Sequence, residues 1–324
     1  MIKMEDIARV CGVSKSTVSL ALNMPHKISK AKRELIVQTA KEMGYFDKKA
    51  MACTQALLVI PDFAHTYFDT YYNEVLFGII NTLQTDRVIF QLLSSFNVIY
   101  SDIYKNQGII FLGDTPKSDI ARAKTFRLPF VLCGHMVDDP EVHSVRFDFE
   151  DGFADLLKYA QSCGHKNIPL IRGTFEQEHY YEKLVDKVYL KSMKSKDNTL
   201  ICPVKYSDLQ TIEIAVNTIL KAKPKITAIL CSDDFLAYAT MKVLKKLKVA
   251  VPGEMSIMGF DGINLPIYLE APVPALTTVS VDRRRLGEES VLMLKRMINK
   301  FTIKNKQELL PVTLQVRDSV KTLR

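Results

Sequence analysis

Apolar residues at helical spacing open the chain. Met4, Ile7, Ala8 and Cys11 recur at i, i+3, i+4 and i+7, and this stripe predicts a first helix. Gly12 follows the last apolar position, where a glycine can take the left-handed conformation that ends a helix. The spacing therefore predicts one short amphipathic helix that stops at a glycine.

A second helix is predicted directly after this glycine. Ser14 is a good N-cap, and the inward face consists of Val18, Ala21 and Leu22. The remaining side chains point outward, and they are Lys15, Ser16, Ser19 and Leu20. Two helices joined by a short glycine turn are typical of a helix-turn-helix, whose second helix enters the DNA major groove. An ordinary corner between two helices has the same pattern.

A third helix completes a small helical unit. Ser29 is its candidate cap and Gly44 its end, and the apolar face is formed by Leu35, Ile36, Thr39, Ala40 and Met43. Three short helices need only a small core. The pattern therefore predicts a separate headpiece over residues 1–46.

From Ala56 onward, short β-rich runs alternate with helical stripes. The predicted strands are 57–61, 87–93, 108–113, 129–134, 144–149, 167–173, 199–204, 227–232 and 256–262. Helical stripes follow around 75–83, 153–160, 178–193, 212–219 and 235–248. Apolar strands separated by helices indicate parallel sheets covered on both faces. Roughly ten strands are too many for one comfortable sheet, so we predict two doubly wound lobes.

Composition and charge agree with this two-part organisation. A chain of 324 residues with 47% hydrophobic and 25% charged residues has room for about two globular domains. Residues 1–50 contain ten Lys and Arg against five Asp and Glu, so five of the eight net positive charges lie there. Such an excess suits contact with phosphates, although a basic surface can also be simply solvated.

The six cysteines show no spacing that suggests a metal site or a disulfide framework, and we expect reduced thiols. The first residues are charged and begin a helix at once, which leaves no room for a signal peptide. No uninterrupted apolar run reaches about 18 residues. We therefore expect a cytoplasmic protein that neither spans nor binds a membrane, with no cofactor and no metal.

Enzymes are the rival class, because doubly wound sheets host many of them. The sequence contains no GxGxxG after the first strand and no GxxxxGK[ST], HExxH or GxSxG motif. We therefore predict no catalytic residue. The alternative hypothesis is an α/β enzyme that binds a sugar or another metabolite and carries an accessory helical domain.

Residues 4–45 resemble the headpiece of the LacI/GalR (lactose-repressor/galactose-repressor) family of bacterial transcription regulators. The similar strings are Ile7-Ala8, Gly12-Val13-Ser14, Thr17-Val18-Ser19, Leu22-Asn23, Ser29, Arg33-Glu34 and Gly44-Tyr45. The resemblance implies a homodimer that reads a pseudo-palindromic operator on double-stranded DNA. It also implies a repressor whose affinity for DNA is set by a small molecule, a sugar being one class, or by a protein co-effector.

The rest of the chain resembles the family's second domain, which is built like a periplasmic sugar-binding protein of type I. The similar strings are Gly164-His165, 231–234, 251–257, 259–261, 276–279 and 316–319. The resemblance implies three passages between the lobes. We place a hinge or linker at 47–55 and the effector-binding and dimerisation domain at 56–324, with lobe one at 56–142 and 276–303 and lobe two at 143–275 and 304–324.

On the DNA-reading face, Lys15 and Ser16 are the best candidates for base contacts. Leu20 stands where the family commonly has arginine, and leucine can pack on a thymine methyl but cannot donate to guanine. The candidates for phosphate contacts are Thr17, Ser19, Asn23, Ser29 and Arg33.

The family's hinge helix inserts a leucine into the minor groove. Residues 47–55 contain no leucine, so either Met51 acts as the wedge or the segment is a plain linker.

Ligands in such folds bind between the lobes, at the carboxyl ends of the strands. The family pattern points to Tyr67 and Phe68 as a stacking platform and to Asp148, Asp233 and Asp261 as acceptors. Tyr67 and Phe68 could instead be core residues or dimer contacts, Asp233 could cap the next helix, and Asp261 could hold a turn. Tyr180 occupies the region where the family often places an arginine, and Ser232 stands where an asparagine is usual. These departures imply a retuned or empty pocket.

Overall fold

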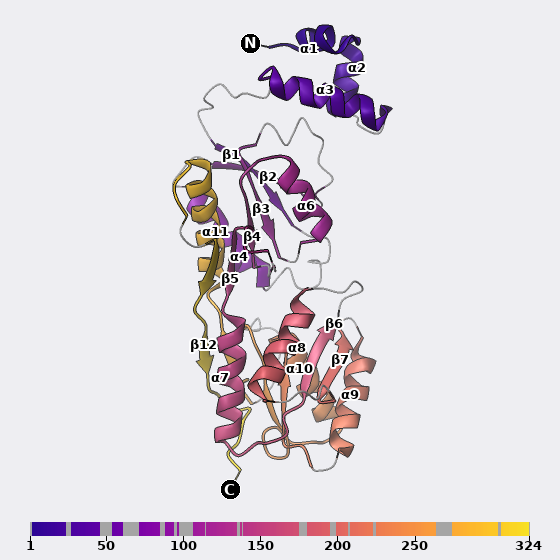
Figure 1. The fold of residues 1–324 in the computed structure, drawn as a ribbon. Helices are drawn as coiled ribbons and strands as arrows, with labels where there is room; N and C mark the ends of the chain where they lie inside the picture. The colour runs from indigo at the N-terminus through magenta and orange to yellow at the C-terminus, as the bar shows by residue number, and fades with distance from the viewer. Residues whose placement is uncertain are drawn as a thin grey trace.

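The computed structural model describes most of the chain. The described residues are 2–23, 27–45, 54–60, 71–84, 88–93, 96, 106–113, 115–134, 137, 139–174, 180–194, 199–206, 208–222, 225–263, 274–303 and 306–323. Tyr67, Phe68 and Met51 lie outside this set. Figure 1 shows a helical headpiece followed by two α/β lobes along the length of the molecule.

The headpiece consists of the three predicted helices. They are α1 (Met4–Cys11), α2 (Lys15–Asn23) and α3 (Lys30–Glu42). Gly12 adopts a left-handed conformation (φ 63°), and its N–H group caps the end of α1. The three helices share their own core, formed by Ile7, Ala8, Val18, Ala21, Leu22, Ile36, Val37 and Ala40. The predicted headpiece is therefore confirmed as a unit with its own hydrophobic core.

Lobe one contains a parallel six-stranded sheet in the order β11-β5-β4-β3-β1-β2. Its strands are β1 (Thr54–Val59), β2 (Val88–Leu93), β3 (Gly108–Leu112), β4 (Phe130–Cys133), β5 (Ser144–Phe147) and β11 (Gln307–Leu310). Helices α4 (Asn73–Gln84) and α11 (Arg283–Ile298) pack together on one face, and α6 (Lys117–Thr125) covers the other. Alternate β1 side chains, such as Leu57 and Leu58, enter the two different cores. Burial on both faces explains why the inner strands β3 and β4 are entirely apolar.

Lobe two contains a parallel four-stranded sheet in the order β7-β6-β8-β9. Its strands are β6 (Leu170–Thr174), β7 (Ile201–Lys205), β8 (Ala228–Cys231) and β9 (Ser256–Met258). Its helices are α7 (Phe149–Ser162), α8 (Tyr180–Ser192), α9 (Leu209–Lys221) and α10 (Asp234–Lys246). Cores made with α7 and α8 and with α9 and α10 cover the opposite faces of the sheet. Both lobes are therefore doubly wound, as predicted.

The chain passes between the lobes three times, after β5, after β10 (Thr278–Ser280) and after β11. Strand β10 pairs antiparallel with β12 (Thr313–Gln315) and is bridged to lobe two through Met258 and Thr277. These passages bring the carboxyl ends of strands from both lobes to a common region.

The predicted lobe boundaries need correction. Residues 143–147 and 304–310 were assigned to lobe two, but β5 and β11 pair with each other in the six-stranded sheet of lobe one. Residues 276–280 were assigned to lobe one, but β10 lies beside β9, which belongs to lobe two. The chain therefore returns to lobe one at 281–282. Strands at a crossover are apolar in either sheet, and hydrophobic pattern alone cannot say which sheet they join.

Among the described residues, no helix combines the length and the apolar character needed to cross a bilayer. The same residues contain no group of three or more His, Cys, Asp or Glu side chains that could hold a metal ion.

Candidate functional site

Helix α2 presents the polar start of its sequence to solvent. Val18, Ala21 and Leu22 are completely buried against α1 and α3, which fixes the rotation of the helix. The opposite side consequently faces outward, with Lys15 and Ser16 exposed and Leu20 half-buried. The outward orientation predicted for the start of this helix is therefore confirmed. Its contacts with bases remain a prediction.

A hydroxyl network holds the first turn of α2. Ser14 Oγ accepts the Thr17 N–H at 3.1 Å, which is the predicted N-cap. The same oxygen lies 2.7 Å from the Ser16 hydroxyl and 2.8 Å from that of Thr17. Lys15 is also tied down, because its Nζ lies 2.7 Å from Glu5 Oε1 on α1. This hydrogen bond raises the pKa of Lys15 and lowers the pKa of Glu5.

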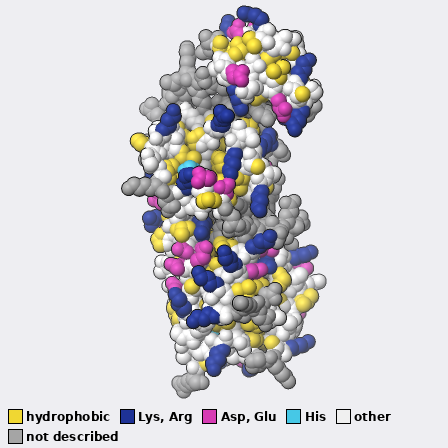
Figure 2. All heavy atoms as spheres, viewed as in Figure 1, with side chains coloured by type: hydrophobic (Ala, Val, Ile, Leu, Met, Phe, Trp, Pro, Cys, Tyr) yellow, Lys and Arg dark blue, Asp and Glu magenta, His cyan; other side chains and the backbone are white. Residues whose placement is uncertain are grey.

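The predicted phosphate-contacting residues are spread over the headpiece. Thr17 and Ser19 are half-buried on α2, and Asn23 ends that helix, with its side chain outside the described set. Ser29 is exposed at the N-cap position of α3, as predicted, but its side chain makes no cap hydrogen bond. Arg33 is half-buried on the first turn of α3. Figure 2 shows Lys and Arg side chains around the headpiece surface, with acidic side chains interspersed.

The predicted ligand acceptors of lobe two are mostly engaged by the protein itself. Asp233 caps α10 by accepting the Leu236 N–H at 2.9 Å through Oδ1. Its Oδ2 accepts hydroxyls from Tyr206 at 2.7 Å and from Ser232 at 3.0 Å. Burial raises the pKa of Asp233. The capping alternative is therefore confirmed, and both carboxylate oxygens already have partners.

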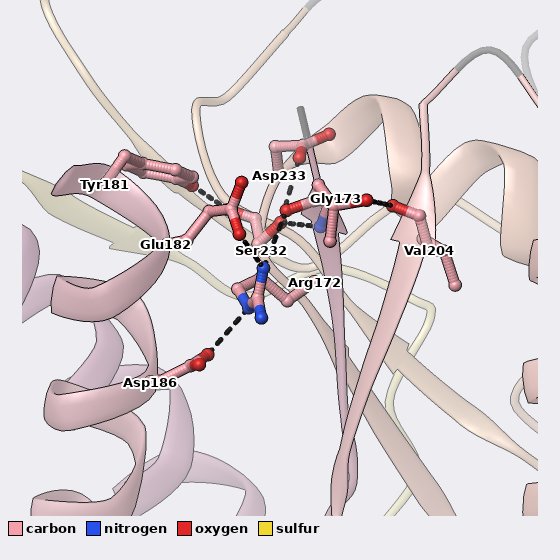
Figure 3. Close-up of polar contacts among 9 residues, drawn as sticks. Arg172, Gly173, Tyr181, Glu182, Asp186, Val204, Ser232 and Asp233 are labelled. Atoms are coloured by element: carbon pink, nitrogen blue, oxygen red, sulfur yellow. Dashed lines mark hydrogen bonds and ion pairs between the residues drawn. The ribbon is translucent and has the colours of Figure 1, made fainter. Parts of the chain in front are cut away.

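Figure 3 shows how β6, β7, α8 and the end of β8 build this cluster around Ser232 and Asp233. Ser232 Oγ accepts the Gly173 N–H at 3.3 Å, and the Ser232 carbonyl accepts the Tyr181 hydroxyl at 3.1 Å. A Cβ atom at Gly173 would lie only 2.1 Å from the Tyr206 ring. Glycine at this position therefore lets Tyr206 reach Asp233.

A buried ion-pair group lies beside this cluster, between β6 and α8 (Figure 3). Arg172 is only 8% exposed, and its guanidinium contacts Glu182 Oε2 at 2.8 Å and Asp186 Oδ1 at 2.7 Å. Burial raises the pKa of Asp186 despite the arginine. The side chain of Tyr180, at the start of α8, lies outside the described set. The guanidinium of Arg172 holds α8 against β6 through these carboxylates.

Two further carboxylates lie at the ends of lobe-two strands. Asp234 is completely buried and accepts the Thr278 hydroxyl at 2.6 Å and the Ile263 N–H at 2.7 Å. Burial raises its pKa to about 7. Burial and the neighbouring carboxylates also raise the pKa of Asp261 well above its usual value. The backbone of Asp261 has a positive φ of 110° and forms an isolated β-bridge with Ser280.

Asp148 caps α7, with its Oδ1 accepting the Asp151 N–H at 3.2 Å. This half-buried carboxylate therefore also has a structural role, which the sequence did not assign to it.

Several residues near the ends of the strands and at the junction of the lobes were not predicted. The Arg283 guanidinium donates to the Asp261 carbonyl at 2.6 Å and lies 5.7 Å from the centre of the Tyr71 ring, so it links the two lobes. Burial raises the pKa of Tyr71 and Tyr72, and negative charge at Asp261 contributes. Tyr206 follows the carboxyl end of β7, and that position was the sequence signal that could have identified it.

The matches to known families follow this division into parts. Residues 3–47 match the model described as bacterial regulatory proteins, lacI family, and residues 158–320 match that of the periplasmic binding protein-like domain. The repressor CytR of Escherichia coli K12 is 25% identical to the chain, over 99% of this chain and 96% of CytR. Catabolite control protein A of Priestia megaterium is also 25% identical, over 98% of each protein.

The chain belongs to the LacI family of bacterial regulatory proteins.

Solved LacI-family structures share the complete fold. The complex of the transcriptional regulator CelR with cellobiose has a TM-score of 0.66 at 23% identity, and covers 98% of this chain and 100% of CelR. The Lac repressor dimer bound to operator and the anti-inducer ONPF has a TM-score of 0.69 at 19% identity, with 99% of each chain covered. The chain is a LacI-family regulator rather than an enzyme, which confirms the predicted class.

A cavity and an exposed apolar surface of this LacI-family chain also bear on its function. A cavity of about 420 Å³ lies between the first turn of α11 and the crossing segments 280–282 and 310–313. On lobe one, large apolar side chains are exposed on α4 and on the edge strand β2, namely Phe77, Ile80, Ile89 and Leu92. Their exposed fractions of 46–63% are unusual for residues of this size on adjacent elements.

Proposed function

We propose that the chain is a transcriptional repressor whose dimer reads a pseudo-palindromic operator, and that a ligand between its lobes controls the affinity. The observation that carries this proposal is the start of α2, which is polar, exposed and supported by an independent three-helix core. A second helix presented in this way suits insertion into a major groove. The net positive charge of residues 1–50 supports the same role.

Within the headpiece, we assign base contacts to Lys15 and Ser16. Leu20 packs on a thymine methyl in this proposal, since it offers no donor to guanine. The phosphate contacts are assigned to Thr17, Ser19, Asn23, Ser29 and Arg33. Phosphate contacts position the headpiece without reading the sequence, so within α2 specificity resides in Lys15, Ser16 and Leu20.

The dimer in this proposal forms through the exposed apolar side chains of α4 and β2. Four large side chains there, including Phe77 and Leu92, are about half exposed or more in the single chain. A second copy related by a two-fold axis would bury the same surface on both partners. The two headpieces would then meet half-sites about 34–36 Å apart, which is one helical turn of DNA.

A small molecule in the interlobe cleft is the proposed effector. Relatives with this fold include a regulator solved with cellobiose, which supports a ligand rich in hydroxyl groups. Because Asp233 already accepts two hydroxyls from the protein, such a ligand must compete with Tyr206 for it. A differential affinity of roughly 1–3 kcal/mol between the two lobe arrangements would switch operator binding.

We infer a cytoplasmic location from the same proposal, because a chain that controls an operator works beside the bacterial chromosome. A protein co-effector is the second candidate regulator. It would act on the lobes without entering the cleft.

Two linked measurements test this function. Selection of preferred duplexes from a random pool should yield a dyad-symmetric consensus, and a panel of sugars, nucleosides and phosphorylated metabolites should contain a compound that changes binding. Asp233→Asn should weaken that response without altering the consensus. Asp155→Asn, at an exposed pair with Lys158, is the matched control and should leave both unchanged. A pool that yields no consensus contradicts the proposal.

A further inference from the structure

An acidic side chain lies beside the DNA-reading end of α2. Glu5 in the first turn of α1 and Lys15 at the start of α2 form an ion pair, with Nζ and Oε1 separated by 2.7 Å. Their side chains are 51% and 63% exposed. The pair therefore lies on the surface, with room for a partner against both charged ends.

Glu5 is not required to cap its own helix. The N-terminus of α1 is closed by Asp6, whose Oδ2 accepts the Lys3 N–H at 2.9 Å. Asp6 also forms the local ion pair with Arg9, at 3.1 Å. Because Asp6 supplies these contacts, the carboxylate of Glu5 is available to extend toward α2.

We propose that Glu5 and Lys15 act together as the reader of one G·C base pair in each half-site. This inference rests on the proposed function, because it places α2 in the major groove. Lysine donates to guanine O6 and N7, and glutamate accepts from cytosine N4, so the pair carries one complementary group for each base.

The spacing of the ion pair suits this task. Guanine O6 and cytosine N4 are hydrogen-bonded to each other, so they lie about 2.9 Å apart on the groove edge. The Lys15 ammonium and the Glu5 carboxylate are 2.7 Å apart, and a donor can therefore meet O6 while an acceptor meets N4. Ammonium groups have three donors, so Lys15 can contact the base and keep its bond to Glu5.

The carboxylate also opposes binding to unmatched DNA. It repels phosphates at every sequence, and the contact with cytosine compensates for that repulsion only at the matching base pair. Glu5 therefore increases discrimination and lowers non-specific affinity. Lys15 alone would favour guanine but would bind any duplex more tightly.

The experiment uses the full-length chain and the operator selected for the wild type. Each base pair of the half-site is replaced in turn, and binding is measured for the wild type, Glu5→Ala, Glu5→Gln and Lys15→Ala. Glu42→Ala is the control, because Glu42 is an exposed acid on α3 that contacts Gln38. Circular dichroism verifies that each variant is folded.

The wild type should prefer G·C at one position by on the order of tenfold. Glu5→Ala should lower that preference at this position alone, to the weaker preference for guanine that Lys15 has by itself, and it should bind non-specific DNA more tightly. Glu5→Gln, which keeps an acceptor oxygen but loses the charge, should retain part of the preference. In the double variant Glu5→Ala with Lys15→Ala, discrimination at this base pair should fall little further than in Lys15→Ala. Glu42→Ala should retain the full preference.

Unchanged discrimination at every base pair in Glu5→Ala would overturn the shared reading while leaving DNA binding intact. A uniform gain in affinity, without loss at one position, would likewise reduce Glu5 to a general electrostatic role and overturn it. A wild type that selects no consensus would overturn this inference together with the proposed function.

Discussion

The start of α2 and the Asp233 cluster both collect polar side chains, but they differ in what those side chains already contact. Lys15 and Ser16 are exposed, and their partners are other surface groups that water or DNA can replace. Asp233 is 6% exposed, and both its oxygens are occupied by the protein. The first region is prepared for a partner from outside, whereas the second must give up internal hydrogen bonds before it can bind one.

The energetic consequence follows from this difference. A surface ion pair or hydroxyl contact contributes little to folding, so its side chains can be used for recognition with small cost to stability. A buried carboxylate that loses a donor incurs the desolvation cost of an unmade hydrogen bond. Substitutions in the two regions should therefore act on different quantities: DNA affinity in the headpiece and stability with ligand response in lobe two.

The largest effect is expected in the headpiece. The double variant Lys15→Ala with Ser16→Ala should weaken operator binding by at least about 2 kcal/mol, roughly 30-fold, because both proposed base contacts are lost. Its unfolding midpoint should stay close to that of the wild type. Equilibrium binding to the selected operator provides the test, with Glu42→Ala as the control. If the double variant bound the operator as tightly as the wild type does, the assignment of α2 as the helix that reads DNA would be contradicted.

An intermediate effect is expected for Tyr206→Phe. Loss of the hydroxyl that Tyr206 donates to Asp233 should lower the free energy of unfolding by about 1 kcal/mol. The vacated acceptor position should also let a hydroxyl-bearing effector bind more tightly. Tyr189→Phe is the matched control, since Tyr189 donates to the Ile168 carbonyl at 2.8 Å away from Asp233.

Urea unfolding and titration with the identified compound measure both quantities. The control should lose similar stability and keep wild-type ligand affinity. Equal ligand affinity in Tyr206→Phe and the wild type would contradict competition at Asp233.

The smallest effect is expected in the pH dependence of stability. The folded-state pKa of Asp234 is raised to about 7, above the unfolded value of about 3.9. At pH values between these two pKa values, the folded state binds a proton at Asp234 more tightly than the unfolded state does. Asp234 therefore stabilises the fold most at low pH, and this contribution is lost as the pH rises toward 7.

Between pH 8 and pH 5.5, the melting temperature of the wild type should therefore rise relative to that of Asp234→Asn. Burial lowers the pKa of His165, which acts in the opposite direction but is common to both proteins. Asp155→Asn should show no such relative change. A difference between the wild type and Asp234→Asn that does not vary with pH would contradict the raised pKa.

The headpiece was predictable because its signals are local. Gly12 ends α1, Ser14 starts α2, and the apolar stripe fixes which side chains point outward. The doubly wound class was predictable for a similar reason, since strands buried on both faces must be apolar throughout. Assignment of β5 and β11 to a lobe depended on pairing between distant segments, which periodicity does not encode.

The surroundings of the proposed effector site were predicted less completely. Ser232, Asp233 and Asp261 follow strands and could be found by position, but the occupation of Asp233 by Tyr206 could not. That contact needs Gly173 on a neighbouring strand to leave room for the ring. The pairing of Arg172 with Glu182 and Asp186 likewise joins β6 to a helix ten or more residues away.

The central claim is that an exposed helix in a basic headpiece reads DNA through both phosphates and bases. Its most direct test measures the affinity of the full-length chain for the selected operator and for a scrambled duplex over a range of salt concentrations. If the dimer neutralises about 6–10 phosphates, log affinity should fall against log salt with a slope of about −5 to −9 on both duplexes. The operator should bind at least about 10³-fold more tightly than the scrambled duplex. A slope near zero, or equal affinity for the two duplexes, would contradict the claim.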